Sequence, residues 1–228
     1  MNLLTTNNTK LLKGNGKGYM TFVLHLSPAD SSGKEVCPKR TAGCTAACLN
    51  TAGRGKMHKV QAGRLRKTRW YHEDREGFMA QLVKDIKAGI RRAEKHDAIP
   101  CFRLNGTSDI PWERVHIGGK NLFQLFPDVQ FYDYTKILNR KVQAYPNYHL
   151  TFSRAESNDR DVDRAIAAGM NVAVVFDEMP KRYMGKRVVD ADNDDLRFLD
   201  PKGVVLGLKA KGRGKKDTSG FVVRTKKA

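Results

Sequence analysis

The chain has 228 residues, and its 42 Lys and Arg against 24 Asp and Glu give a formal net charge of +18. Because 40% of the residues are hydrophobic, a chain of this length can bury a core, which argues against global disorder. No apolar run approaches the roughly 20 residues that span a bilayer, and no signal peptide is recognisable. We therefore expect a soluble, cytoplasmic protein with no membrane partner.

The charge is unevenly distributed. Residues 1–72 carry 13 basic and 2 acidic side chains, residues 202–228 carry 9 and 1, and the middle of the chain is nearly neutral. Two basic flanks around a neutral body are typical of a face that meets nucleic acid, a nucleotide or another polyanion, although solubility alone also favours surface charge. We expect one domain over residues 19–208, between a basic arm (1–18) and a basic tail (209–228).

Strand-length and helix-length patterns alternate along the chain. Residues 57–95 repeat apolar side chains every four positions and predict helices with a break at Gly77, and residues 161–169 predict a shorter helix. The acidic stretch 179–201 predicts irregular structure. Apolar β-branched and aromatic runs predict strands at 19–26, 99–104, 129–134, 148–153, 172–176 and 204–208, with a candidate strand at 221–224. This order indicates an α/β fold with a mainly parallel sheet, either a partial barrel or an open wound sheet.

In such a sheet, the residues that follow each strand meet along one edge. Lys136, Arg154 and Asp109 follow predicted strands and are candidate catalytic residues. A basic side chain at such a position can hold a carboxylate or a phosphate. Ser153 and Asp177 are candidates for binding a cofactor in the same pocket. Each of these side chains could instead cap a turn.

Three cysteines in the loop 29–55 form a C-x6-C-x3-C pattern: Cys37, Cys44 and Cys48. Clustered cysteines without a secretion signal indicate metal or redox chemistry, and three thiolates leave one position open on a zinc ion or on one iron of a four-iron cluster. Three interpretations stay open: an iron–sulfur site, a zinc site completed by Cys101 or His58, and cysteines that bind no metal. Cys101 alone reads as a buried strand residue.

Five strings between the cysteine loop and the C-terminus are distinctive: CPKRTAGCTAAC (37–48), FRLNGTSD (102–109), FYDYTK (131–136), LTFSRAESN (150–158) and VVDADNDDLRFLDPKGVVLGLKAKG (188–212). With them the chain resembles the gene product 88-like proteins of phages and plasmids over about residues 14–213. The resemblance implies a phage or mobile-element origin, hence the host cytoplasm, and assigns no activity.

The layout also resembles that of radical S-adenosylmethionine enzymes. In those enzymes a three-cysteine loop follows the first strand of a partial (β/α)6 TIM-like barrel, and a glycine-bearing motif after the second strand holds the cofactor. The resemblance implies the same barrel here, with Asn105, Gly106 and Ser108 as cofactor-binding residues. The cysteine spacing differs from the C-x3-C-x2-C of those enzymes, so Cys37 would supply a ligand from upstream.

An acidic segment follows the fifth predicted strand, with one arginine among its aspartates: Asp190, Asp192, Asp194, Asp195, Arg197 and Asp200. Such a segment can form internal ion pairs, hold a divalent cation as in a nuclease, or recognise a ribose or an amine. It lacks the glycine and terminal glutamate of an EF-hand loop.

Eight basic residues are candidates for binding nucleic acid: Arg64, Arg66, Lys67, Arg69, Lys211, Arg213, Lys215 and Lys216. Trp70, Tyr71 and Phe221 lie nearby in the sequence and could stack on bases, or could pack in the core. No helix-turn-helix, zinc-finger, RNP or Walker signature is present.

The leading interpretation is a phage-type iron–sulfur protein, radical-S-adenosylmethionine-like in layout, that acts on or binds nucleic acid or a nucleotide. One alternative is a non-catalytic nucleic-acid-binding protein with structural zinc. The other is a metal-dependent nuclease that uses the acidic segment.

Overall fold

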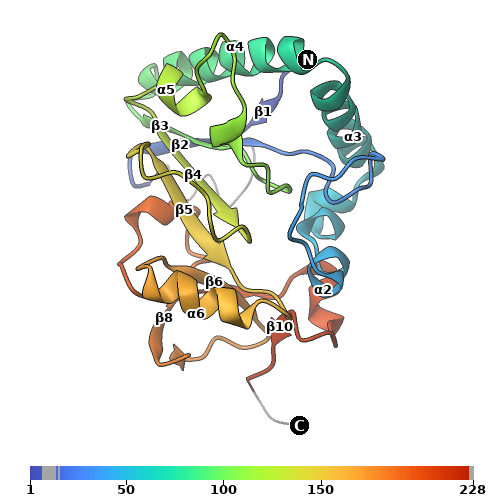
Figure 1. Cartoon of the computed structure of the whole chain (residues 1–228), viewed down its shortest axis with the longest axis vertical. Coiled ribbons are helices and arrows are strands. Elements are labelled where there is room, and N and C mark those ends of the chain that lie inside the picture. The colour runs from blue at the N-terminus through green and yellow to red at the C-terminus, as the bar shows by residue number, and fades with distance from the viewer. Residues whose placement is uncertain (7–13, 15, 226–228) are drawn as a thin grey trace.

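The structure is a computed structural model that describes residues 1–6, 14 and 16–225. It has a single large sheet with helices beside it (Figure 1). The strands are β1 (Leu4–Thr5), β2 (Tyr19–Leu24), β3 (Ile99–Arg103), β4 (Gln130–Thr135), β5 (Tyr148–Ser153), β6 (Val172–Phe176), β7 (Arg182–Tyr183), β8 (Lys186–Asp190), β9 (Val205–Lys209) and β10 (Val222–Val223). The α-helices are α2 (Ala42–Ala46), α3 (His58–Glu73), α4 (Arg75–Glu94), α5 (Leu122–Leu125) and α6 (Asp159–Ala167). Short 3-10 helices are η1 (Leu49–Thr51), η2 (Gly53–Lys56), η3 (Trp112–Arg114), η4 (Arg197–Leu199) and η5 (Gly212–Lys216).

The strands follow the order β1-β2-β3-β4-β5-β6-β9-β8-β7. All neighbours from β2 to β8 are parallel, and β1 and β7 add antiparallel pairs at the two edges. The mainly parallel sheet predicted from the sequence is therefore confirmed. The finer expectation of a partial barrel is not confirmed; in the described part of the chain the two edge strands do not pair with each other, so the sheet is open.

The C-terminal segment completes the sheet beside β6. β5 pairs only with the start of β6, at Val172 and Ala173, whereas β10 pairs with its end, at Val175 and Phe176. β10 thus pairs with the half of β6 that β5 does not reach. The residues expected as a basic tail, like those expected as an N-terminal arm, contribute a strand to the sheet.

α4 covers one face of the sheet. The apolar stripe predicted from its four-residue repeat, Phe78, Leu82 and Ile86, is fully buried in a cluster with Phe22 and Phe102 of the sheet. α6 covers the same face of the sheet at β6, where Val162 and Ala165 pack with the buried side chains of that strand. We call the opposite face, on which Cys101 and Tyr132 lie, the inner face.

The boundary between α3 and α4 differs from the prediction. It lies at Asp74 rather than at Gly77, because the Asp74 carboxylate accepts the Gly77 N–H at 2.9 Å and caps α4. A Cβ at Gly77 would collide with this carboxylate. The glycine therefore serves the cap of a new helix and not the end of the old one.

The acidic stretch is more ordered than predicted. Its first part forms the β7–β8 hairpin, which turns at Met184 and Gly185, both with positive φ. Its second part crosses the inner face, where Leu196 and Phe198 pack near Tyr132.

Internal ion pairs hold this second part in place. They join Asp192 to Lys211 at 2.5 Å, Asp194 to Lys17 at 2.6 Å, Asp195 to Arg103 at 3.0 Å, and Arg197 to Asp194 and Asp200 at 3.1 and 3.3 Å. Four of the five aspartates considered for a nuclease are thus engaged with basic side chains of the same chain, and Asp190 accepts the Asp192 N–H at 2.8 Å. Within the described residues, no helix has the length and apolar character needed to traverse a bilayer.

Candidate functional site at the carboxyl edge of the sheet

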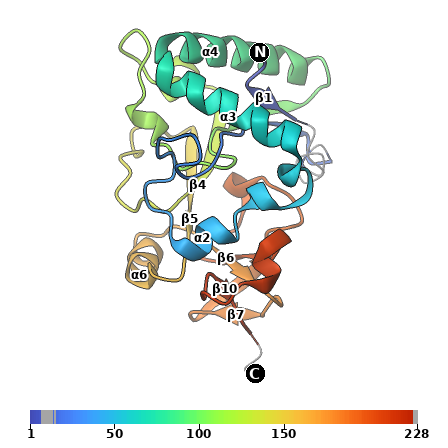
Figure 2. The ribbon, with the colours of Figure 1, turned by 90° about the vertical axis from the view of Figure 1, so that its right-hand side faces the viewer.

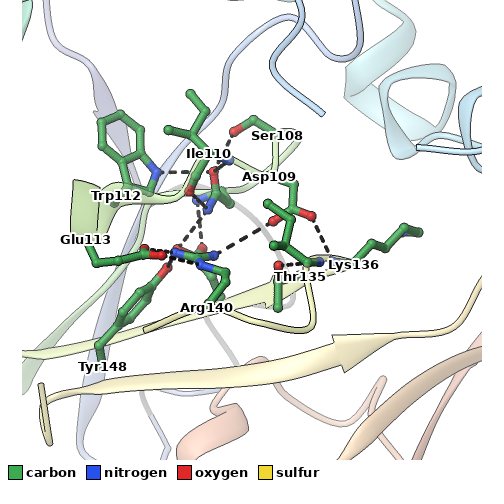
Figure 3. A network of polar contacts seen from close by, with 12 residues as sticks. Ser108, Asp109, Ile110, Trp112, Glu113, Thr135, Lys136, Arg140 and Tyr148 are labelled. Carbon is green, nitrogen blue, oxygen red and sulfur yellow. Dashed lines mark hydrogen bonds and ion pairs between the residues drawn. The ribbon is translucent and has the colours of Figure 1, made fainter. Parts of the chain in front are cut away.

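The loop after β3 is fixed by the side chain of Asn105 (Figure 3). Its Oδ1 accepts hydrogen bonds from the Ser108 hydroxyl, the Ile110 N–H and the Trp112 indole at 2.9, 2.9 and 3.1 Å. Its backbone N–H donates to Asp133 of β4 at 2.7 Å. Asn105 and Ser108, predicted to bind a cofactor, therefore shape the loop.

A buried charged network lies below this loop. Arg140 donates to both carboxylate oxygens of Glu113, at 3.1 and 2.5 Å, and to the Tyr148 hydroxyl at 2.9 Å, which donates in turn to Asp133 at 2.9 Å. Burial raises the pKa of Asp133 to about 7, against the opposing effect of the Asn105 N–H and of nearby arginines. The network holds β4, β5 and the loops that follow them in one fixed arrangement.

Asp109 and Lys136 are joined through the backbone. The Asp109 carboxylate accepts the Lys136 N–H at 2.8 Å, and burial raises the pKa of Asp109. The Lys136 side chain extends away from this network (Figure 3), and its Nζ lies 5.8 Å from the centre of the Phe221 ring. Of these two predicted catalytic residues, Asp109 fixes the backbone at Lys136, and the Lys136 ammonium group lies over the Phe221 ring.

Gly106 brings the loops after β2 and β3 together. Its N–H donates to the Leu24 carbonyl at 2.9 Å, and a Cβ here would lie 2.5 Å from Nδ1 of His25. No larger residue fits without displacing His25 or the backbone of β2.

The cysteine loop is attached to the sheet by Glu156, which follows β5. The Glu156 carboxylate accepts from the Thr41 hydroxyl and the Gly43 N–H, both at 2.7 Å, and Thr41 caps α2 by accepting the Cys44 N–H. A Cβ at Gly43 would collide with Ser219 of the C-terminal segment and approach Glu156. Glu156 was not among the predicted site residues, because only the folded chain brings it to the loop.

The thiols of the loop lie within electrostatic reach of one another. The Cys37 thiol accepts the Ala29 N–H at 3.4 Å and donates to the Thr107 carbonyl at 3.8 Å. Burial, with the nearby Cys48 and Cys44 thiols adding to it, raises the pKa of Cys37 to about 12. The three predicted ligands therefore lie close enough for their charges to interact, with Cys37 beside the loop after β3.

Cys48 has cationic neighbours. Its thiol accepts the Asn50 N–H at 3.5 Å. Burial raises the pKa of Cys48, whereas Arg64 and Lys136 lower it. Arg64 is half-buried, donates to Asn50 Oδ1 at 2.5 Å, and its Nε has no hydrogen-bond partner in the structure. Positive charge thus faces the thiols from both α3 and the end of β4.

Cys101 is separate from this group. It is fully buried on the inner face, where its thiol lies 3.1 Å from the Thr21 hydroxyl. Burial raises its pKa to about 12. His58 is exposed at the start of α3. Cys101 is the buried strand residue that the sequence predicts.

The remaining predicted edge residues hold the C-terminal segment. Arg154 donates to the carbonyls of Gly220 and Phe221 and pairs with Asp159 at 3.3 Å. Asp177 accepts from the Thr225 N–H at 3.0 Å. The Ser153 carbonyl accepts the side-chain amide of Asn158 at 3.0 Å. These contacts are structural.

The predicted nucleic-acid-binding residues divide into two sets. Arg64 and Lys67 are half-buried, and Lys67 donates to the Leu3 carbonyl at 2.6 Å. The other residues are exposed, and one of them, Lys211, pairs with Asp192: Arg66, Arg69, Lys211, Arg213, Lys215 and Lys216. η5, which carries the last three, packs against η1 of the cysteine loop (Figure 2). A Cβ at Gly214 would lie 3.5 Å from Ala47, and one at Gly212 would lie 2.9 Å from Ala52.

No three His, Cys, Asp or Glu side chains within the described ranges are arranged as ligands of one metal ion. The model of the family described as Gene product 88 matches residues 2–225 and supports the assignment as a phage-type protein. The description of that family names no activity. No curated protein and no solved structure matches the chain, so the resemblance to radical S-adenosylmethionine enzymes has no support from these comparisons.

Proposed function

The chain belongs to the gene product 88 family, and we propose that it is an iron–sulfur protein that acts on nucleic acid, with Cys37, Cys44 and Cys48 as the cluster ligands. The observation that carries the proposal is that three thiols from one loop, at the carboxyl edge of a parallel sheet, lie close enough to influence one another's pKa. This edge is where α/β proteins place their ligands.

A cluster suits these thiols better than a single ion does. One zinc ion requires four ligands in a tight tetrahedron. A four-iron cluster is larger than one ion and holds its thiolates further apart. Cys101, the obvious fourth ligand for zinc, is engaged with Thr21 on the inner face.

The surroundings of the thiols also favour a cluster. Backbone N–H groups donate to Cys37 and Cys48, and hydrogen bonds to sulfur tune the potential of iron–sulfur centres. Arg64 and Lys136 offset the negative charge that three thiolates bring to a partly buried place. Such a cluster would supply electron transfer or an open iron site.

The nucleic acid would bind on the surface beside the loop. Exposed cations of η2, Arg54 and Lys56, and of η5, Arg213, Lys215 and Lys216, come from the two basic flanks of the sequence. Contacts between η1 and η5 and between η1 and η2 bring these segments together. A continuous basic surface of this kind binds phosphate backbones without reading the sequence.

Anaerobic purification with iron, sulfide and zinc analysis tests the cluster. We expect a brown protein with about four iron and four sulfide per chain. The Cys37→Ser, Cys44→Ser, Cys48→Ser variant should be colourless with an unchanged circular dichroism spectrum, and Cys101→Ser should keep its iron. A colourless wild type with one zinc, or iron that persists in the triple variant, would refute the proposal.

A further inference from the structure

The β7–β8 hairpin carries an exposed group of basic side chains at the edge of the sheet. Its sequence from Lys181 to Arg187, KRYMGKR, has four cations, and no carboxylate occurs between Met179 and Val189. Lys181, Arg182 and Arg187 are exposed. None of the four cations takes part in the ion pairs that the described residues form. The hairpin therefore presents positive charge that no described carboxylate pairs with.

The hairpin is anchored to the core by its inner side. Tyr183 packs edge-on against Phe176 of β6 at 5.2 Å between ring centres, and Val188 joins the same apolar cluster. β8 pairs with β9 only from Val188 onward, so the turn and the first residues of β8 extend beyond the paired part of the sheet. Because the turn precedes a strand that is parallel to β9, it lies at the amino edge of the sheet, opposite the cysteine loop (Figure 1). The hairpin is thus a fixed projection away from η5.

Three features of this hairpin are unfavourable for stability. Arg182 lies directly opposite Arg187, and like charges at such positions destabilise a strand pair. Met184 holds a turn position at φ 47°, where glycine, asparagine or aspartate is favoured. Its side chain is 38% exposed at the tip, although methionine is usually buried. A partner with negative charge and an apolar surface would offset the repulsion and cover the methionine.

We propose that the β7–β8 hairpin binds the major groove of duplex nucleic acid, with Arg182 and Arg187 against phosphates and Met184 against the base pairs. Two strands about 4.8 Å apart, with their side chains, fit a groove about 12 Å wide. Phosphates line both sides of this groove and thymine methyl groups lie on its floor, which matches the two arginines and the methionine. The inference rests on the proposed function only in taking nucleic acid as the ligand, and the hairpin shares no residue with the surface of η2 and η5.

Arg187→Glu tests the phosphate contact by fluorescence anisotropy with a labelled DNA duplex and with its single strand. The substitution turns a like-charge pair into an opposite-charge pair, so the Tm should rise. Affinity for the duplex should fall about tenfold at about 0.1 M salt, because a phosphate contact is lost. Arg91→Glu is the matched control: it makes the same charge change at an exposed position of α4, and should lose far less affinity.

Met184→Asn tests the contact with the base pairs. Asparagine tolerates positive φ, so the Tm should rise by about 1–3 °C. Affinity for the duplex should fall severalfold, and affinity for the single strand should stay unchanged. A purely structural role would change stability and binding in the same direction, so opposite changes support a direct contact.

The inference is overturned if Arg187→Glu and Met184→Asn bind the duplex as the wild type does, or if they weaken single-strand binding equally. Loss of binding to phosphatidylserine vesicles, with duplex binding intact, would assign the hairpin to a membrane surface instead. Replacing Arg213, Lys215 and Lys216 with Gln separates this test from that of the proposed function. If only this η5 variant weakens duplex binding, the hairpin inference is wrong; if only the hairpin variants do, the nucleic-acid surface of the proposed function is wrong.

Discussion

The attachment of the cysteine loop to the sheet depends on one carboxylate, and Glu156→Ala removes it. Its two hydrogen bonds, to the Thr41 hydroxyl and the Gly43 N–H, are both 2.7 Å long. Bonds to a charged group contribute about 1.5–3 kcal/mol each, and partial exposure reduces this, so we expect a loss of about 2 kcal/mol in total. For a chain of this length that lowers the Tm by about 4–8 °C.

The same substitution should reduce the iron bound per chain, because α2 loses the contact that holds Cys44 beside Cys37 and Cys48. Glu156→Gln should recover most of both effects: its amide oxygen can accept the Gly43 N–H, and the Thr41 hydroxyl can turn to accept the amide N–H. Asp159→Asn is the control, since this exposed carboxylate pairs with Arg154 and does not touch the loop. The reasoning fails if Glu156→Ala matches Asp159→Asn in Tm and iron content.

Three further predictions concern Asp133 in the buried charged network, Gly106 in the loop after β3, and the exposed cations of η5. Asp133 keeps its proton in the folded state up to about pH 7 and loses it near pH 3.8 in the unfolded chain. The free energy of unfolding should therefore fall by up to about 4 kcal/mol as the pH rises from 4 to 7. Asp133→Asn should flatten this part of the pH profile measured by urea denaturation. Gly106→Ala should destabilise the fold by about 1–3 kcal/mol, whereas Gly63→Ala, in an uncrowded position of α3, should stabilise it by about 0.5–1 kcal/mol; equal Tm values would contradict the close approach. Replacing Arg213, Lys215 and Lys216 of η5 with Gln should reduce the slope of log K for DNA binding against log salt by about two to three. Replacing Arg91, Arg92 and Lys95 at the end of α4 with Gln should leave this slope unchanged.

The parallel sheet could be predicted because its strands are buried on both faces and read as continuous apolar runs, as Val172–Phe176 does. The β7–β8 hairpin could not, since its strands are polar at the sheet edge, with Arg182 opposite Arg187 and Tyr183 opposite Lys186. Its turn uses Met184 at positive φ, which no sequence rule favours.

The candidate site was predictable only in part. The clustering of Cys37, Cys44 and Cys48 is visible in the sequence. Glu156 lies 115 residues from Thr41, and no pattern in its neighbouring sequence marks it as a contact of the cysteine loop. Asn105 and Asp109 were recognised as strand-end polar residues, yet that position alone does not separate a loop-shaping role from a catalytic one.

Burial divides the positive charge of this chain into two groups with different physical roles. Arg64, Lys67 and Arg103 are half-buried near the thiols and His25, where water screens them little, so they favour anions inside the molecule. The exposed cations of η5 face solvent, where salt screens them strongly. Rising salt should therefore weaken nucleic-acid binding steeply and change iron content far less. If both fall together, the charge acts as one diffuse field, and the separation between half-buried and exposed cations is wrong.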